Sequence, residues 1–374
     1  MIFFGPGELS KAFTLLPRPL HAGAFGVMLF PSMNLPLRRI HYPSEGWRAR
    51  LRKGLRLAGR AVMRGPRSRP IVVCAAVMLG IAGVNAGISM AIAAGSRHEA
   101  SAWPGDGFTF WPERSWRQVE RRIRSLPAAP RMESRVIGEV SYRGSSYPIR
   151  LLHFSPLRGD RRPLRVFLAS GVHGTESAGV EALLRLCQEL ARGPRLYAEV
   201  SLDIVPVVNP WGWVHGYRYD GEGEDVNRDF SSRRTQEARI VRSFIDRNGP
   251  YDLVLDLHES KKNGYFIYQY LPASHGLGGE YVRMLGRRGK PRENAYREGI
   301  YATVNGILSM PVSALPWVAL GGRLSLEQYT RLHGTRHSYT VETPLRDAFD
   351  ERVAIHRETV GLFVERLLGG EAGR

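Results

Sequence analysis

The second half of the chain alternates short apolar runs with segments of helical periodicity, and this alternation constrains the fold most strongly. The runs PLRVFLAS (163–170) and DLVLDLHES (252–260) have the length and composition of buried strands. The segment SAGVEALLRLCQELA (177–191) repeats apolar residues at three- and four-residue intervals, which places them on one face of a helix. Short strands that alternate with helices pack as a sheet covered on both sides. We therefore expect a three-layer α/β/α sandwich with a mixed, largely parallel central sheet over residues 135–370.

The other elements of this domain follow from the same patterns. Residues 135–154 form two alternating runs around Arg143-Gly144-Ser145, which is typical of a β-hairpin. Further strands are predicted at 202–209, 265–271 and 338–344, and helices at 114–125, 235–248, 281–289, 295–307 and 350–368.

A long apolar segment, residues 71–94, precedes this domain and contains no charged side chain. A helix of this length would extend ~36 Å at ~1.5 Å per residue, which exceeds the ~30 Å of bilayer hydrocarbon. Arg60, Arg64, Arg67 and Arg69 stand immediately before it, and positive charge stays on the cytoplasmic side. We expect one transmembrane helix, a single-pass protein of the inner or cytoplasmic membrane, and an extracytoplasmic (periplasmic or cell-surface) domain after it.

A secretory signal peptide is the alternative interpretation of the same segment. From Met63 the chain runs from basic residues through the apolar run to Ala91-Ile92-Ala93, which resembles a cleavage site. Cleavage would secrete the domain and make residues 1–62 a misread start or a cytoplasmic tail. The run is longer than the usual ~7–15 apolar residues of a signal, which favours an uncleaved signal anchor. Residues 1–70 are then a basic, disordered tail and residues 95–134 a linker.

The net charge of +18 is concentrated at the N-terminus. Residues 1–70 carry 13 Lys/Arg and two acids, a balance of +11, whereas residues 95–374 account for the remaining +7. No RNP-like, zinc-finger or helix-turn-helix pattern accompanies this charge, so we expect no nucleic-acid partner. Cys74 and Cys187 lie in very different segments, so we expect no disulfide, and without a Cys-x-x-Cys pair a thiolate zinc cluster is excluded.

Polar residues stand at the carboxyl ends of three predicted strands, where α/β sheets form their sites. His173 and Glu176 follow one strand, His258 lies near the end of a second, and Glu342 lies in a late, otherwise apolar strand. Two imidazoles and one carboxylate leave a fourth coordination position open, which is the pattern of a catalytic zinc site. Taken singly, a histidine in a turn is more often an ordinary hydrogen-bonded side chain, whereas for Glu342 the two interpretations are balanced.

A long loop after the predicted strand 202–209 carries further candidates. It runs from Asn209-Pro210 through Arg218 to the sequence Asp225-Val226-Asn227-Arg228. Arginine offers a planar fork that binds carboxylates through two hydrogen bonds, so this loop is a candidate anion site. The alternative is an ordinary charged loop.

Together these four elements resemble the zinc carboxypeptidase (funnelin) family and its bacterial branch near the murein peptide amidases. The resemblance covers about residues 135–368. It implies that His173, Glu176 and His258 bind one Zn²⁺, and that Asn227 and Arg228 hold the terminal carboxylate of a substrate.

The same resemblance assigns further roles. Asp225 would orient the first zinc histidine, Arg218 would stabilise the oxyanion, and Glu342 would be the catalytic base. The family also uses a mobile tyrosine that closes over the substrate, for which Tyr329 and Tyr339 are the candidates.

The implied activity is that of a zinc-dependent metallopeptidase or amidase, a metallocarboxypeptidase-like hydrolase. Its substrate would be a peptide or peptidoglycan-derived molecule with a free carboxylate, cleaved at a C-terminal or stem-peptide bond. The loop 209–230 also fits succinylglutamate desuccinylases and aspartoacylases, so an N-acyl amino acid deacylase stays open, although the sequence Thr-Val-Glu-Thr-Pro at 340–344 resembles the peptidases more closely. A non-catalytic binding module, anchored in the membrane through residues 71–94, is the third possibility.

Overall fold

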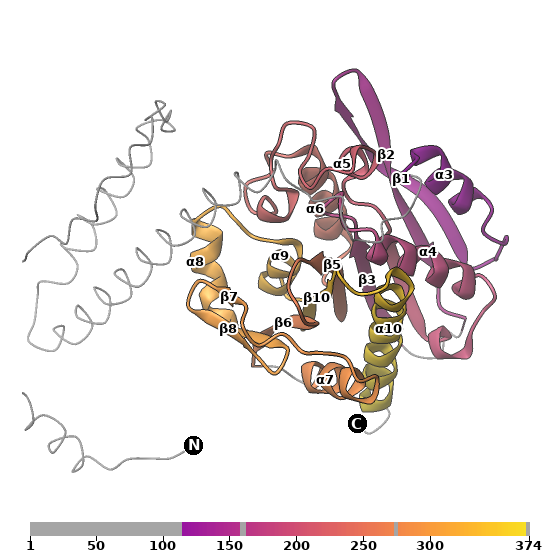
Figure 1. Cartoon of the computed structure of the whole chain (residues 1–374). Helices are drawn as coiled ribbons and strands as arrows, with labels where there is room; N and C mark the ends of the chain where they lie inside the picture. The colour runs from indigo at the N-terminus through magenta and orange to yellow at the C-terminus, as the bar shows by residue number, and fades with distance from the viewer. Residues whose placement is uncertain (1–113, 158–161, 273–275, 372–374) are drawn as a thin grey trace, which may run out of the picture. The chain divides into compact units, whose positions relative to one another are not determined.

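The computed structural model describes residues 114–157, 162–272 and 276–371, which form a sheet flanked by helices (Figure 1). The expected membrane segment 71–94 and the basic tail lie outside the described residues. Within those three ranges, no helix combines the length and the apolar character needed to cross a membrane.

The sheet is mixed, and its strand order is β1-β2-β4-β3-β5-β10-β6-β9-β8-β7. The four central strands β4, β3, β5 and β10 are parallel, whereas β2 and β6 pair with them in the antiparallel sense. The carboxyl ends of the central strands therefore meet at one edge. The strands are β1 (Met132–Tyr142), β2 (Ser145–Phe154), β3 (Leu164–Ser170), β4 (Val200–Val205), β5 (Leu253–Ser260), β6 (Phe266–Leu271), β7 (Arg297–Glu298), β8 (Tyr301–Val304), β9 (Ile307–Pro311) and β10 (His337–Pro344).

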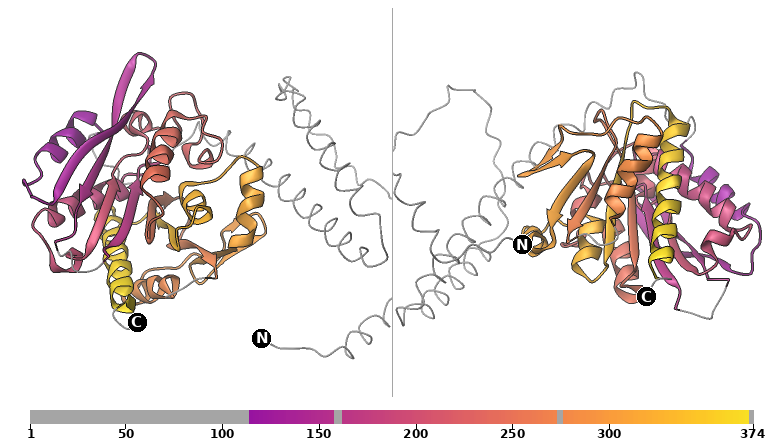
Figure 2. Two further views of the ribbon diagram at one scale, coloured as in Figure 1. Left: turned by 180° about the vertical axis from the view of Figure 1, so that it is seen from behind. Right: turned by 90° about the horizontal axis from the view of Figure 1, so that it is seen from below.

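Helices cover both faces of the sheet (Figure 2). The α-helices are α3 (Trp116–Arg124), α4 (Ala178–Leu190), α5 (Pro210–His215), α6 (Gln236–Asn248), α7 (Leu277–Arg287), α8 (Leu315–Leu320), α9 (Leu326–Leu332) and α10 (Phe349–Glu371); short 3₁₀ turns are η3 (Arg195–Tyr197), η4 (Val226–Arg228) and η5 (Val312–Ala314). Val166 and Leu168 of β3 belong to a buried cluster with Phe363 of α10. Phe167 points the other way and packs against Phe244 of α6, with ring centroids 6.3 Å apart. This alternation produces the expected three layers.

The predicted α/β fold with a mixed sheet is confirmed, and most predicted elements agree with the structure within a few residues. The helix predicted at 295–307 is wrong, because this segment forms β7, β8 and the start of β9. Asn305 and Gly306 both have positive φ, 53° and 78°, and turn the chain between β8 and β9. An Asn-Gly pair is a strong hairpin signal, and here it overrides the helical spacing of the apolar residues.

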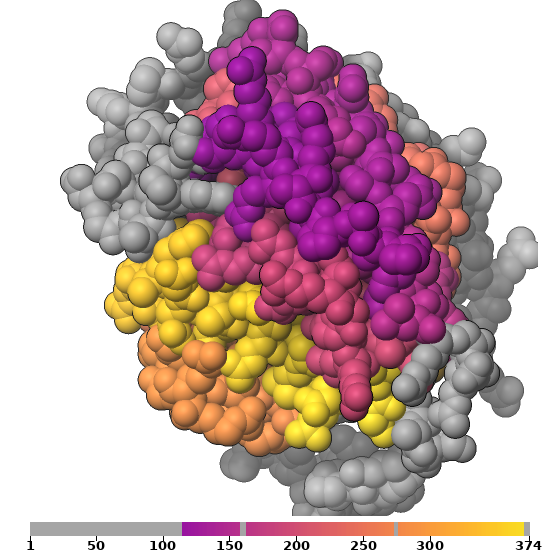
Figure 3. Space-filling model, turned by 90° about the vertical axis from the view of Figure 1, so that its right-hand side faces the viewer, coloured from indigo at the N-terminus to yellow at the C-terminus, as the bar shows by residue number. Residues whose placement is uncertain are grey.

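Helix α3 lies within the segment expected to be a linker, yet it packs onto the domain. Val119 and Ile123 on its inner face are buried in the same cluster as α4 and α10. Figure 3 shows this region beside α4 and α10 on one face of the molecule. Cys187 of α4 is buried and free, whereas Cys74 lies outside the described residues.

Candidate metal centre and substrate cavity

His173 and Glu176 lie in the turn between β3 and α4. Gly171, with φ of 59°, directs the chain away from the strand, and Glu176 N donates to His173 O at 3.1 Å. A Cβ on Gly174 would lie only 2.0 Å from the backbone of Gly212 in α5. The glycine therefore allows the turn to press against the neighbouring loop and fixes both side chains in direction.

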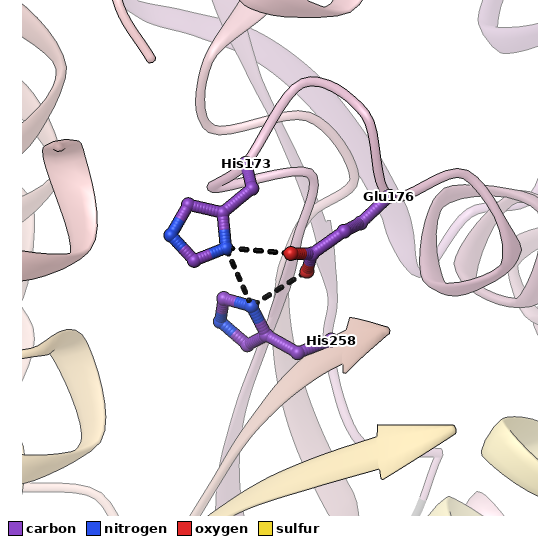
Figure 4. A group of neighbouring side chains, drawn as sticks. All are labelled: His173, Glu176 and His258. Carbon is purple, nitrogen blue, oxygen red and sulfur yellow. Dashed lines mark hydrogen bonds and ion pairs between the residues drawn. The ribbon is translucent and has the colours of Figure 1, made fainter. Parts of the chain in front are cut away.

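The two histidines and Glu176 converge on one point (Figure 4). His173 Nδ1 and His258 Nδ1 each lie 2.7 Å from an oxygen of the Glu176 carboxylate, and 3.1 Å from each other. One potential ligand atom from each residue falls within a 4.8 Å cluster, and all three residues are buried. Two imidazoles and a carboxylate are donors that zinc accepts, so the residues present fit this ion.

The outward nitrogen of each histidine faces a carboxylate. His173 Nε2 lies 3.1 Å from Asp225 Oδ1, and His258 Nε2 lies 2.8 Å from Asp256 Oδ2. A carboxylate at this position holds the proton on Nε2 and leaves the Nδ1 lone pair for a metal. The structure thus brings Asp225 to its expected place.

Asp256 was missed in the sequence, although the pattern Asp256-Leu257-His258 contains the signal. Residues two apart on a strand share a face, so an acid two positions before a candidate histidine is placed to contact it.

Neighbouring charges shift the pKa values of several groups in this cluster. Burial opposes ionisation of Glu176, yet the two neighbouring imidazoles outweigh burial and lower its pKa. Burial likewise disfavours charge on His258, but Asp256 and Glu176 raise its pKa well above the ordinary value. The pKa of Asp225 is held well below its usual range by His173 and Arg218, against the effect of burial. Because a metal needs its ligands deprotonated, metal binding at this site should depend on pH.

Glu342 stands directly opposite His258 in the parallel pairing of β10 and β5. Its Oε2 is buried and has no hydrogen-bond partner among the described residues. Burial raises the pKa of this carboxyl to about 8. The side chain lines a cavity of about 330 Å³ together with His173 and Glu176.

The two loop arginines also line this cavity but make different contacts. Arg218 donates from Nη1 to Glu176 Oε1 at 3.2 Å and lies 3.5 Å from Asp225. Arg228 has its Nη2 3.5 Å from Glu298 Oε1, an acid on β7 that the sequence analysis did not single out. Each predicted cation therefore reaches the cavity with a carboxylate beside it.

Asn227 is largely engaged within the protein. Its Oδ1 accepts from Leu326 N at 3.1 Å, and its Nδ2 lies 3.3 Å from His258 Nε2. The side chain therefore holds the start of α9 and lies beside His258, and it lines the cavity together with its neighbour Arg228.

Neither candidate for a closing tyrosine is in the cavity. Tyr329 donates its hydroxyl to Asp246 and is buried beside α6, and Tyr339 packs against Phe363 in the opposite layer. The tyrosines that line the cavity are Tyr217, Tyr219, Tyr268 and Tyr296.

A buried ion pair supports the turn from beneath. Arg352 of α10 donates to Glu259 Oε1, and Glu259 Oε2 accepts from Ala178 N at 2.8 Å. Burial raises the pKa of Glu259, although Arg352 acts in the opposite sense. The carboxylate thus satisfies the first turn of α4 directly behind Glu176.

Comparisons with known proteins agree with this geometry. The sequence model of the succinylglutamate desuccinylase/aspartoacylase catalytic domain matches residues 163–275, which contain His173, Glu176 and His258. Over these residues the chain is similar to zinc carboxypeptidase-like proteins. A solved metallo-carboxypeptidase from Burkholderia cenocepacia, 18% identical, matches the structure with a TM-score of 0.52, over 67% of this chain and 68% of its own. At that identity the likeness concerns the fold.

Two curated relatives match a shorter part of the chain. "Probable carboxypeptidase 2" of Trichophyton verrucosum (strain HKI 0517) is 33% identical over 102 residues, 26% of this chain and 20% of its own length. "Carboxypeptidase 2" of Trichophyton rubrum is 30% identical over 129 residues, 33% of this chain and 24% of its own. The chain therefore spans about a fifth to a quarter of these relatives.

Proposed function

We propose that the protein is a zinc-dependent hydrolase that cleaves a peptide-type amide bond near a free carboxylate. The observation that carries the proposal is the convergence of His173, Glu176 and His258 beside Glu342, whose free Oε2 lines the same cavity. Three protein ligands and a neighbouring acid are what a hydrolytic zinc site requires.

The residues around the cluster would divide the work of hydrolysis. Zinc would polarise the scissile carbonyl and lower the pKa of a water toward about 7. Glu342 would accept the proton of the attacking water on Oε2 and deliver it to the leaving amine. Arg218 would donate to the negative charge that develops on the carbonyl oxygen. Arg228 would hold the substrate's carboxylate and so fix the position of the bond.

Product analysis with a matched pair of variants tests this proposal. The zinc-loaded full chain is incubated with C-terminal peptide libraries, muropeptides and N-acyl amino acids, and the products are identified by mass spectrometry. Glu342→Gln should lower turnover by about 10²–10⁴-fold and retain zinc, because the amide cannot accept a proton. Glu365→Gln, at an exposed position on α10, should behave as wild type. Undiminished turnover by Glu342→Gln would refute the assignment of the base.

An N-acyl amino acid deacylase is the second candidate, and the family match over 163–275 favours it. It would use the same cluster, since both reactions cleave an amide next to a carboxylate. Turnover of the N-acyl amino acid pool alone would select this function over the peptidase.

The location of the domain is part of the proposal. The apolar segment 71–94 and the arginines before it support a membrane-anchored domain on the outer side, where stem peptides of the cell wall are the expected substrates. Protease added to spheroplasts, from which the outer layers of the cell have been removed, should then degrade the domain, whereas protection until the cytoplasmic membrane is lysed would contradict this orientation.

A further inference from the structure

The cavity contains an acid that a simple carboxylate site does not need. Glu298 lies on β7, in the outer segment of the sheet, and its Oε1 is 3.5 Å from Nη2 of Arg228. This arginine is the residue that the proposed function assigns to the substrate carboxylate. A substrate that carried only negative charge would meet attraction from Arg228 and repulsion from Glu298 at almost the same place.

The contact between the two side chains is long for an ion pair. Charge-assisted hydrogen bonds between guanidinium and carboxylate groups are usually about 2.7–2.9 Å, whereas Nη2 and Oε1 are 3.5 Å apart. Both side chains keep access to the cavity, with exposed fractions of 28% for Arg228 and 21% for Glu298. The two side chains are therefore neighbours that both reach the cavity, and each can still bind a group of the substrate.

Besides its contact with Arg228, Glu298 is held by a chain of two tyrosines. Tyr268 donates to Tyr296 at 3.0 Å, and Tyr296 donates to Glu298 Oε2 at 3.3 Å. Burial, together with the charge of Glu298, raises the pKa of Tyr268 well above its usual value and keeps this donor protonated. This hydrogen bond holds Oε2 and leaves the other carboxylate oxygen, Oε1, beside Arg228.

We propose that Glu298 is a specificity-determining residue that selects substrates whose carboxylate-bearing end residue also carries an ammonium group. This inference rests on the proposed function, because it assigns the carboxylate of the same substrate to Arg228. The ammonium would pair with Glu298 Oε1 while the carboxylate pairs with the guanidinium. The separation of the protein pair requires the two ligand charges to be near each other, so a short side chain suits the site better than a long one.

Binding to a chain whose turnover is strongly reduced tests the preference directly. The zinc-loaded full chain with Glu342→Gln is titrated calorimetrically with benzoylglycyl dipeptides that end in 2,3-diaminopropionate or ornithine. Their neutral counterparts end in 2-aminobutyrate and norleucine, and both enantiomers of each end residue are used. The ammonium ligands should bind about ten- to a hundredfold more tightly than the neutral ones, which is the range for a hydrogen bond to a charged group.

Substitution of Glu298 then shows whether this acid selects ammonium-bearing ligands or only positions Arg228. In the same chain, Glu298→Gln should weaken the binding of the ammonium ligands and leave the binding of the neutral ligands unchanged. The ratio of the two affinities should then fall to about one. Glu298→Asp should restore part of it, and the exposed Glu365→Gln on α10 should change nothing. Equal affinity for charged and neutral ligands before substitution would overturn the proposal. An equal loss for both after Glu298→Gln would also overturn it, because the acid would then only brace Arg228.

The outcome is distinguishable from a failure of the proposed function. If the wild-type chain hydrolyses no amide in the product analysis, the hydrolase proposal fails, yet the charge preference in binding is still measured on its own.

Discussion

A buried acid beneath the loop that carries Arg218 and Asp225 should make the stability of this domain depend on pH. Glu237, on α6, is 0% exposed, and Tyr142 donates its hydroxyl to Glu237 Oε2 at 2.7 Å. The same hydroxyl lies 3.2 Å from Asp220, whose Oδ1 accepts from two backbone amides of the loop. One hydroxyl proton cannot satisfy two ionised carboxylates. Burial, with a smaller contribution from Asp220, raises the pKa of Glu237 from 4.5 to about 7.

The sign and size of the effect follow from this shift. Because the folded pKa of Glu237 exceeds the unfolded value, the folded state binds the proton more tightly. The resulting stabilisation is complete below about pH 4.5 and is lost as the pH rises through about 7. For a change from 4.5 to about 7, the contribution of Glu237 to the free energy of unfolding should fall by about 2.5 kcal/mol between pH 5 and pH 8.

Urea unfolding measures this contribution when it is referred to Glu237→Gln. The full chain and the variant are unfolded at pH 5, 6, 7 and 8, with tryptophan fluorescence as the signal. The free energy of unfolding of the full chain, minus that of Glu237→Gln, should fall by about 2.5 kcal/mol from pH 5 to pH 8. The exposed Glu365→Gln serves as the control, and its difference should be flat. A flat difference for Glu237→Gln would show that this acid ionises as readily in the folded state as in the unfolded state.

Three further outcomes are expected. Asp256→Asn should weaken zinc binding by about 10–100-fold in chelator competition without loss of circular dichroism, because His258 Nε2 loses its ionic partner; unchanged affinity would deny that role. Phe363→Ala should lower the free energy of unfolding by about 3–5 kcal/mol in urea, since the ring is buried against Tyr339; a loss below 1 kcal/mol would contradict this packing. Chelation should lower the melting temperature, and added zinc should raise it in a concentration-dependent manner; a melting temperature insensitive to zinc would argue against binding at the His173 cluster.

The sequence predicted the central parallel strands and the meeting of His173, Glu176 and His258, for one physical reason. Parallel strands with helical crossovers place their carboxyl ends together, so polar residues that end apolar runs are brought into one cluster. Asp256 was available from the same pattern, because it shares a face of β5 with His258.

The sequence did not predict the acid beside Arg228. Glu298 lies in the segment predicted to be a helix at 295–307, and the turn at Asn305-Gly306 was not used to separate two strands. Its partner Arg228 is 70 positions away in the chain, and no local pattern links two residues at that distance. The contact depends on how the outer strands fold back over the cavity, which is decided by tertiary packing.

The order of strands places the residues of the two proposed tasks, hydrolysis and selection of the end residue, in separate parts of the sheet. His173, His258 and Glu342 are carried by the parallel strands or the turn that follows one of them, whereas Tyr296 and Glu298 belong to the segment of β7 beyond β9 and β8. An insertion, deletion or exchange in residues 291–311 could therefore redirect which end residue is accepted and leave the hydrolytic cluster in register. A protein with this architecture can change its range of substrates through sequence changes at one edge of its sheet.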